Sequence, residues 1–340
     1  MQIDSWVEEI PFKAPLAIAG RTLVGQSVLR VTGRHAGLVA EAEAAGVFYH
    51  GDDGHRMRAQ VQEVLPRLGE DLPTAWRAVR AMRPGGARNA LDWVMWQLAA
   101  GASGRPVHEL AFLSRLRPLA TMVTLGLASA SRMAQAALAL PEARMLKLKL
   151  EGTEADAERV TAVRRARPDV RLGIDANEGW TLGHLERMTA TLLAQGVELI
   201  EQPLPASRDD ELAGYRSPIP LAADESLQTL DDLDQVATRY QVANIKLDKC
   251  GGLSAALTLA NEARQRGMRV MIGCMGGRSL AILPAFIAAQ TADLVDLDAP
   301  LFMAGDTAPA ARYAQGQVSF DVDALDVAAP ARRSPVSAWL

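Results

Sequence analysis

Short apolar segments alternate with helical stretches between about residues 117 and 300, and this rhythm constrains the fold more than any other feature of the chain. Eight segments have the pattern of strands: PLATMVTLG, ARMLKLKL, VRLGID, VELIEQP, IPLAADES, VANIKLD, MRVMIGC and DLVDLDAP. Eight strand–helix alternations in about 180 residues predict a parallel sheet that closes into a barrel.

Charged residues recur at the carboxyl ends of these predicted strands. Their spacing of 22 to 27 residues corresponds to one strand–helix unit per step. Because the active site of a parallel barrel lies at the carboxyl ends of its strands, we expect these side chains to surround one site. A single such charge is ambiguous with a helix N-cap, but six at matching places favour a site. The positions, which include one glycine, are Lys149, Asp175, Glu201, Asp224, Lys246, Gly273 and Asp298.

The segment MLKLKLEG, residues 145–152, combines an apolar face with a charged one. Its leucines alternate with Lys147 and Lys149, so the leucines share one face of a strand and the lysines share the other. The lysine face points either to water at a sheet edge or into a site that requires two positive charges. In a closed barrel we expect both lysines at the mouth, with Lys246 across the barrel from them.

Three carboxylates converge if the barrel is correct: Asp175 in IDANEGW, Glu201 in LIEQPLP and Asp224 in AADES. Carboxylates on adjacent strands repel one another unless a cation neutralises them. Oxygen ligands without cysteine or histidine beside them suit Mg²⁺ or Mn²⁺ better than zinc. The alternative is that each carboxylate caps a loop or a helix.

The first hundred residues have an α+β pattern. Two predicted strands, 23–31 and 37–44, are joined by a turn, and residues 85–104 form a predicted helix with apolar residues at helical spacing. The expected organisation is an α+β domain over residues 1–115, a barrel domain over residues 116–305, and a C-terminal segment, residues 306–340, that returns to the first domain.

Composition excludes several classes of protein. The formal net charge is −4, so nothing indicates a nucleic-acid partner. The longest apolar run, LAILPAFIAA, is about half of a membrane span and contains a proline, so we expect no membrane segment. The N-terminus lacks the pattern of a signal peptide, and Cys250 and Cys274 form no Cys-x-x-Cys pair. We therefore expect a cytoplasmic protein, and the sequence leaves a homo-oligomer open.

The motifs KLK, DAN, EQP, ADES and NIKLDKCGG, in this order, resemble those of the enolase superfamily in its muconate-lactonizing branch. ARNALDWVMWQLA resembles a helix of that branch's N-terminal domain. The Asp-x-Asp pair in DLDAP, Asp296 and Asp298, is most similar to the dipeptide epimerases. The resemblance covers nearly the whole chain and implies an α/β fold, a modified TIM barrel of the (β/α)7β type with an N-terminal α+β capping domain.

The same resemblance implies roles for the charged residues. Asp175, Glu201 and Asp224 would hold one Mg²⁺ ion, for which Mn²⁺ is a substitute. Lys147 would bind the carboxylate of a small-molecule substrate. Lys149 and Lys246 would stand on opposite faces of the α-carbon, one removing its proton and the other returning one, in keeping with the superfamily's pattern of a lysine or histidine base beside magnesium.

Substrate recognition is also implied by the resemblance. Asp296 and Asp298 would bind the free ammonium of a dipeptide. The specificity loops would be residues 17–25 and 46–55, with Arg21 at the position that meets a glutamate side chain. Tyr49 and Met275 complete the expected substrate-binding set. The second loop and GCMGGRS, residues 273–279, depart from the family pattern.

The expected reaction is epimerisation of the C-terminal residue of an L,L-dipeptide, with L-Ala-L-Glu as the leading substrate and peptidoglycan peptides as its source. The alternatives are N-acylamino-acid racemisation, o-succinylbenzoate synthesis, muconate cycloisomerisation, and epimerisation of hydrophobic or basic dipeptides.

Overall fold

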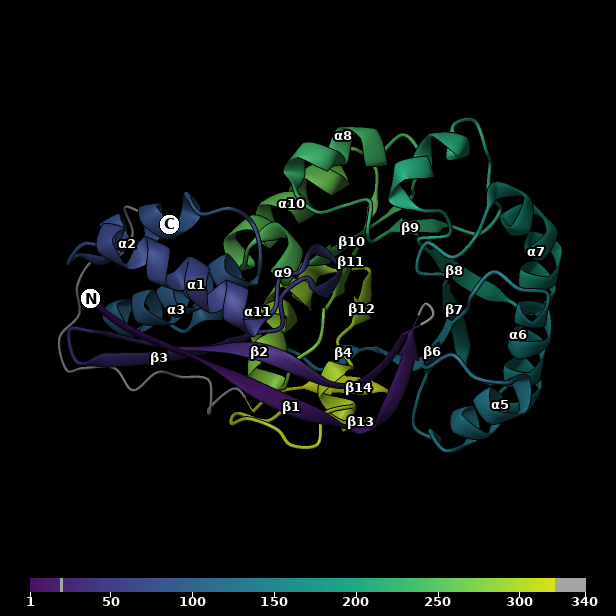
Figure 1. The fold of residues 1–340 in the computed structure, drawn as a ribbon, viewed down its shortest axis with the longest axis horizontal. Helices are drawn as coiled ribbons and strands as arrows, with labels where there is room; N and C mark the ends of the chain where they lie inside the picture. Colours follow the sequence, from purple (N-terminus) through teal and green to yellow (C-terminus); the bar gives the residue numbers. More distant parts are fainter. Residues whose placement is uncertain (19–20, 322–340) are drawn as a thin grey trace.

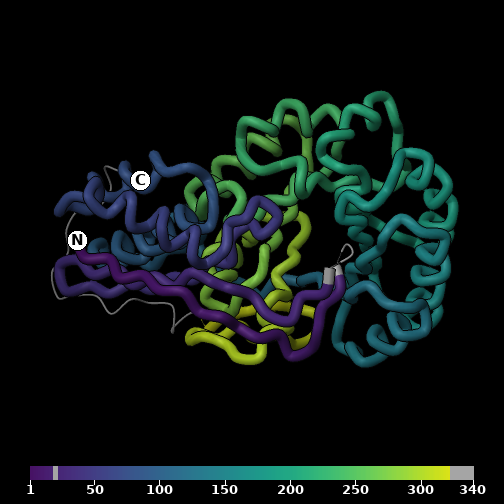
Figure 2. Tube along the Cα trace, in the orientation of Figure 1, coloured from purple at the N-terminus to yellow at the C-terminus, as the bar shows by residue number. Residues whose placement is uncertain are grey.

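The computed structural model describes residues 1–18 and 21–321, except for the side chains of Ile18 and Arg21. Figure 1 shows two layers side by side: an N-terminal layer with a long antiparallel sheet and helices, and a larger ring of strands and helices. The path of the chain in Figure 2 shows the N-terminal strands extending from the N-terminal layer to the ring.

Eight parallel strands form the ring, in the order β12-β11-β10-β9-β8-β7-β6-β5. This confirms the predicted barrel and all eight of its strands. The strands are β5 (Met122–Leu125), β6 (Met145–Lys149), β7 (Arg171–Asp175), β8 (Val197–Glu201), β9 (Leu221–Ala223), β10 (Val242–Lys246), β11 (Arg269–Gly273) and β12 (Leu294–Asp296).

Helices cover the outside of the ring between successive strands (Figure 1). They are α5 (Ala130–Leu138), α6 (Ala155–Ala166), α7 (Leu182–Ala194), α8 (Leu233–Val236), α9 (Leu247–Cys250), α10 (Leu253–Gln265) and α11 (Ser279–Ala288), with short 3₁₀ turns at Ala206–Leu212, Leu230–Asp232, Ala289–Thr291 and Ala299–Leu301.

The interior of the barrel has an apolar floor below a polar mouth. Strand alternation sends every second side chain inward, so residues two or four places apart on one strand share the interior. The floor is one buried cluster of Met122, Met145, Leu199, Ala222, Val242, Met271 and Leu294. On five of these strands, β6, β8, β9, β10 and β12, the charged side chains of the mouth follow two or four residues further along.

Side-chain hydrogen bonds join the first strand of the barrel to the segment around the last. Thr121 Oγ accepts a hydrogen bond from the backbone N–H of Leu297 at 3.0 Å. The backbone N–H of Thr124 donates to Asp298 Oδ2 at 2.6 Å. An aspartate predicted to bind substrate therefore also helps to close the ring.

The N-terminal layer is built on the sheet β1-β2-β3, which consists of β1 (Gln2–Ile18), β2 (Arg21–His35) and β3 (Leu38–Ala44). Helices α1 (Gly54–Val64), α2 (Leu72–Arg80) and α3 (Gly86–Ser103) complete it, with a 3₁₀ turn at Phe48–His50, a second at Leu65–Arg67, and the short α4 (Val107–Leu110) after it. Helix α3 is buried nearly all round, since it packs against the sheet on one side and against α9 and α10 on the other. A side chain at Gly33 would clash with Val94 of α3, so the glycine permits this close packing.

The hairpin of β1 and β2 reaches from the N-terminal layer to the barrel mouth (Figures 1 and 2). The backbone N–H of Lys13 donates to Phe302 O at 2.8 Å, and that of Leu127 donates to Ala17 O at 3.1 Å. The strand β1 was not predicted, whereas β2, β3 and α3 lie close to their predicted positions.

A small sheet pairs β4 (Leu119–Ala120) with β14 (Gln317–Ser319), which in turn pairs with β13 (Arg312–Ala314). The segment PLATMVTLG is therefore divided between β4 and the barrel strand β5. The segment expected to return to the first domain was residues 306–340, and of these, residues 322–340 lie outside the described residues. Within the described part, no helix is long and apolar enough to span a membrane.

Candidate active site

The carboxyl ends of the barrel strands surround one cavity of about 390 Å³. Lys149, Asp175, Glu201, Lys246 and Asp296 are the last residues of their strands, and Asp224 follows β9 directly. The cavity is lined by eight residues predicted for the site: Tyr49, Lys147, Lys149, Asp224, Lys246, Met275, Asp296 and Asp298. Asp175 and Glu201 lie below them and are fully buried.

Lysine is concentrated at this cavity. The chain contains five lysines among its 36 basic residues. Lys147, Lys149, Lys246 and Lys249 are all buried around the mouth, whereas Lys13 is exposed. Since charged side chains are rarely buried without a partner, this clustering indicates a site that requires amines.

The segment MLKLKLEG left open whether its lysine face points to water or into a site. Its strand, β6, is buried on both faces. The amine of Lys149 lies 2.5 Å from Asp175 Oδ2. The amine of Lys147 lies 3.2 Å from Glu201 Oε2 and also pairs with Asp296. The lysine face therefore points into the barrel, and the leucines pack under the surrounding helices.

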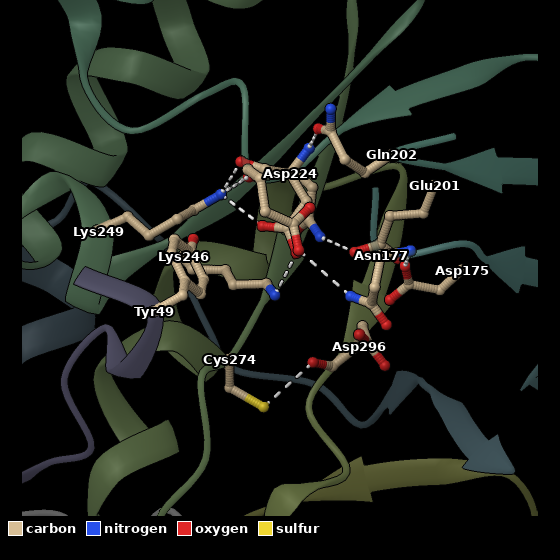
Figure 3. A network of polar contacts seen from close by, with 12 residues as sticks. Tyr49, Asp175, Asn177, Glu201, Gln202, Asp224, Lys246, Lys249, Cys274 and Asp296 are labelled. Carbon is tan, nitrogen blue, oxygen red and sulfur yellow. Dashed lines mark hydrogen bonds and ion pairs between the residues drawn. The ribbon is translucent and has the colours of Figure 1, made fainter. Parts of the chain in front are cut away.

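Asp224 is held from several directions (Figure 3). Its Oδ2 accepts from Lys246 at 2.5 Å, and its Oδ1 accepts from Lys249 at 2.6 Å. Its backbone N–H donates to Gln202 Oε1 at 2.9 Å. Sequence reasoning missed Gln202 and Lys249, although both lie within the motifs EQP and NIKLDKCGG.

The electrostatics of the site favour a cation. Burial and the charges of Asp175 and Asp224 raise the pKa of Glu201 to about 8. Burial alone would lower the pKa of Lys246, but Asp224 and Glu201 raise it well above its ordinary value. A divalent cation bound to these carboxylates would offset their mutual repulsion. It would also lower the raised pKa of Lys246, because it would counter the negative charges beside this amine.

The carboxylates are engaged by lysines rather than by one another. In the described residues, no three carboxylate, imidazole or thiol side chains are grouped so as to hold a metal ion. Because Lys147, Lys149 and Lys246 already bind their oxygens, metal binding requires these side chains to move.

The two aspartates after β12 differ in their surroundings. Asp298 accepts the Thr124 N–H, and burial together with Asp296 raises the pKa of Asp298 to about 6. Asp296 pairs with Lys147 through Oδ2, but its buried Oδ1 has no hydrogen-bond partner among the described residues. A buried acceptor without a donor is unfavourable, so the site is suited to a ligand that donates there.

A second polar chain leads away from Lys149. Its amine donates to Asn177 Oδ1 at 2.9 Å, and Asn177 Nδ2 donates to Glu225 Oε1 at 3.2 Å. Asn177 has a φ of +41°, a left-handed conformation that asparagine tolerates better than most residues. Neither Asn177 nor Glu225 was predicted, although DAN and ADES contain them.

The N-terminal layer closes the cavity from above. Tyr49 lies in the Phe48–His50 turn, and its hydroxyl accepts from Gln228 Nε2 at 3.2 Å. The hairpin contributes Phe12, Leu16 and Leu23 to the cavity wall. The side chain of Arg21, predicted to meet a glutamate, lies outside the described part of the structure.

Arg278, in the departing GCMGGRS segment, joins the two layers. Its Nε donates to Glu43 Oε2 at 2.8 Å, and its side chain also pairs with Glu8. Both glutamates belong to the N-terminal sheet, and Arg278 does not line the cavity. Within the departing segment, Arg278 thus lies at the contact between the layers, whereas Gly276 lines the cavity.

Comparisons with known proteins agree with this architecture. The family model described as Enolase C-terminal domain-like matches residues 128–321. The L-Ala-D/L-Glu epimerase of Escherichia coli K12 is 35% identical over 92% of this chain and 97% of its own. The N-acetyl-D-glutamate racemase of a Pseudoalteromonas species is 44% identical over 71% of this chain and 76% of its own.

Solved structures show the same fold. An enolase family member from Agrobacterium tumefaciens, described as homologous to dipeptide epimerases and solved with sodium and L-Ala-L-Glu, superposes with a TM-score of 0.88. It is 34% identical, and the match covers 93% of this chain and 96% of the other. Other dipeptide epimerases of similar structure were solved with magnesium and a dipeptide.

Proposed function

Because this chain belongs to the enolase superfamily, among its racemases and epimerases of amino acid derivatives, we propose that it inverts the C-terminal residue of an L,L-dipeptide. L-Ala-L-Glu is the substrate that we propose first. The relatives support this choice, since one is named for Ala-Glu and another for N-acetylglutamate.

The observation that carries the proposal is the arrangement of Lys149 and Lys246. They end β6 and β10, and three strands separate these two in either direction around the ring of eight. Both amines face the same cavity. Two bases on opposite sides of an α-carbon are the arrangement that inversion requires, because one removes the proton and the other supplies a proton to the opposite face.

Lys147 supports the same chemistry. Its amine sits deeper in the barrel, between Glu201 and Asp296, where it would bind the α-carboxylate of the substrate. Negative charge develops on this carboxylate as the proton leaves, so a fixed positive charge beside it stabilises the transition state more than the ground state.

Asp175, Glu201 and Asp224 would hold Mg²⁺, with Mn²⁺ as a substitute. The three fit such an ion because they are buried carboxylates with hard oxygen donors, and the charges of Asp175 and Asp224 help to raise the pKa of Glu201. When bound, the ion supplies positive charge to the substrate carboxylate. Lys147, Lys149 and Lys246 would then exchange these protein partners for the substrate.

Asp296 and Asp298 would bind the ammonium of the dipeptide. The buried Asp296 Oδ1 without a partner supports this assignment. Arg21 would bind the glutamate side chain, while Tyr49 and Met275 contribute the wall around the substrate.

A second candidate is N-acylamino-acid racemisation, which the 44% identical relative favours. N-acetylglutamate presents the same α-carbon, carboxylates and acylated nitrogen as Ala-Glu. It lacks the ammonium, so it leaves Asp296 Oδ1 without a donor. The two candidates therefore differ at one place in the cavity.

One experiment tests both. The protein is incubated in D₂O with Mg²⁺ and, separately, with members of an L,L-dipeptide library or with N-acetyl-L-glutamate, and deuterium at the α-carbon is measured by mass spectrometry. We expect exchange at the C-terminal residue of L-Ala-L-Glu. Exchange into N-acetylglutamate alone would replace the first candidate by the second, and exchange into neither would refute both.

A further inference from the structure

Every polar group of Asp224 has a hydrogen-bond partner. Lys249 donates to the backbone carbonyl and to Oδ1 of Asp224, both at 2.6 Å. Lys246 donates to Oδ2 at 2.5 Å. Figure 3 shows the two amines approaching the carboxylate from different sides. One oxygen thus lies on the Lys246 side, and the other is turned away toward Lys249.

Lys249 differs from the other three buried lysines. Its amine also donates to Asn244 O at 3.1 Å, so three acceptors surround an ammonium group that has three N–H bonds. Its side chain is 1% exposed, and it does not line the cavity at the barrel mouth. No donor is left for a substrate, and Lys249 can act on the reaction only through Asp224.

We propose that Lys249 is a positioning residue that keeps Oδ1 of Asp224 occupied, so that this carboxylate offers a metal ion Oδ2 alone. The inference rests on the proposed function, which assigns Asp224 to the metal ion. The consequence is ion selectivity. Ca²⁺ takes six to eight oxygen ligands and accepts bidentate carboxylates, whereas Mg²⁺ requires a compact octahedron. A carboxylate restricted to one oxygen favours Mg²⁺.

Gln202, which follows the neighbouring strand β8, provides a matched control. Its Oε1 accepts from the backbone N–H groups of Asp224 and Ser226, at 2.9 and 3.1 Å, and its Nε2 donates to Ser226 Oγ. It is as buried as Lys249 but makes no hydrogen bond to the carboxylate of Asp224. Substituting Gln202 therefore loosens the position of Asp224 without releasing Oδ1.

The test measures metal binding directly. Wild type, Lys249→Met and Gln202→Met are stripped of divalent ions and titrated calorimetrically with MgCl₂ or CaCl₂. Loss of a positive charge raises the affinity for both ions, so the readout is the ratio of the two affinities. We expect Lys249→Met to shift this ratio toward Ca²⁺ about tenfold or more, because Oδ1 becomes available. Gln202→Met should lower the affinities for both ions and keep their ratio within about threefold of the wild-type ratio.

An unchanged ratio in Lys249→Met, or an equal shift in both variants, overturns the role of Lys249. Absence of Mg²⁺ binding by the wild type overturns the metal site of the proposed function, and this inference with it. If Lys249→Met does not fold, a crystal structure of the wild type with Mg²⁺ decides. One Asp224 oxygen on the ion, with Lys249 still on the other, supports the proposal, and bidentate coordination overturns it.

Discussion

The amine of Lys246 lies 2.5 Å from Oδ2 of Asp224, so a residue proposed to move a proton and a residue proposed to bind the metal ion form one ion pair. Lys149 and Asp175 form the corresponding pair on the other side, also at 2.5 Å. A cation that takes these carboxylate oxygens removes the counter-charges of both lysines. In the proposed mechanism, metal binding and the readiness of the two lysines to accept a proton would therefore be linked.

Chelation should abolish proton exchange. We expect EDTA to lower the rate of α-proton exchange by at least about a hundredfold, since the positive charge that stabilises the developing dianion is lost. Added Mg²⁺ should restore the rate, and circular dichroism should show that the fold is unchanged. Glu201→Gln should cause a loss of similar size even at saturating Mg²⁺. Full turnover after exhaustive chelation would contradict the metal assignment.

Both lysines at the α-carbon should be needed for inversion. Lys149→Ala and Lys246→Ala should each reduce epimerisation by about a thousandfold, because either direction requires one proton acceptor and one donor. Each variant should still exchange the α-proton of one epimer, and the two variants should differ in which epimer that is. Lys13→Ala, at the lysine outside the site, serves as the control. Epimerisation within about tenfold of wild type by either variant would exclude the two-base mechanism.

The barrel was predictable because its information is local and repeated. Each strand is short, apolar and followed by a helix, and alternation alone decides that Lys147 and Lys149 share the face opposite the leucines. The spacing of the charged strand ends then brings Asp175, Glu201 and Lys246 to one edge. The structure places all of these side chains around or below one cavity.

The parts that escaped prediction depend on tertiary contacts. Strand β1 has few buried positions and contains Pro11 and Pro15, so its sequence lacks a clear apolar alternation. Gln202 binds Asp224, 22 residues later in the sequence, across neighbouring strands. A buried glutamine or lysine within a motif has no periodic signature, and its partners become visible only when the barrel is assembled.

A buried carboxyl between the layers should make stability depend on pH. Asn89 Nδ2 donates to Asp248 Oδ1 at 3.0 Å, and backbone N–H groups of Ala45 and Gly46 also reach this carboxylate. Burial, reinforced by the charge of Asp52, raises the pKa of Asp248 to about 6. Because the folded pKa exceeds the unfolded one, the folded state binds more protons between these values, and stability falls as pH rises through that window.

Asp248→Asn removes this titration. The free energy of unfolding of the variant minus that of wild type should therefore increase by about 1–2 kcal/mol between pH 5 and pH 8, whatever the amide costs at a fixed pH. Urea unfolding at the two pH values measures the difference. A difference independent of pH would show that Asp248 titrates normally in the folded protein.

Arg21 should set the preference for an acidic side chain. The described wall near the hairpin is apolar at Phe12, Leu16 and Leu23, so a glutamate side chain requires a charged partner from elsewhere. Arg21→Ala should lower kcat/KM for L-Ala-L-Glu about tenfold or more relative to L-Ala-L-Leu, the value of one charge-assisted hydrogen bond. An equal fall for both dipeptides would remove Arg21 from the specificity determinants.

Asp296 should distinguish a free dipeptide from an N-acylated amino acid. Its buried Oδ1 lacks a donor among the described residues, and an ammonium group would supply one through a charge-assisted hydrogen bond of about 1.5–3 kcal/mol. Asp296→Asn should therefore lower kcat/KM for L-Ala-L-Glu about tenfold to a hundredfold more than for N-acetyl-L-glutamate. The ratio between the two substrates cancels the damage to Lys147, which pairs with Asp296 and would bind the α-carboxylate of both.

The wild type should prefer the free dipeptide for the same reason. If it instead turns over N-acetyl-L-glutamate faster, and the variant affects both substrates equally, then Asp296 serves Lys147 alone and the enzyme is an N-acylamino-acid racemase.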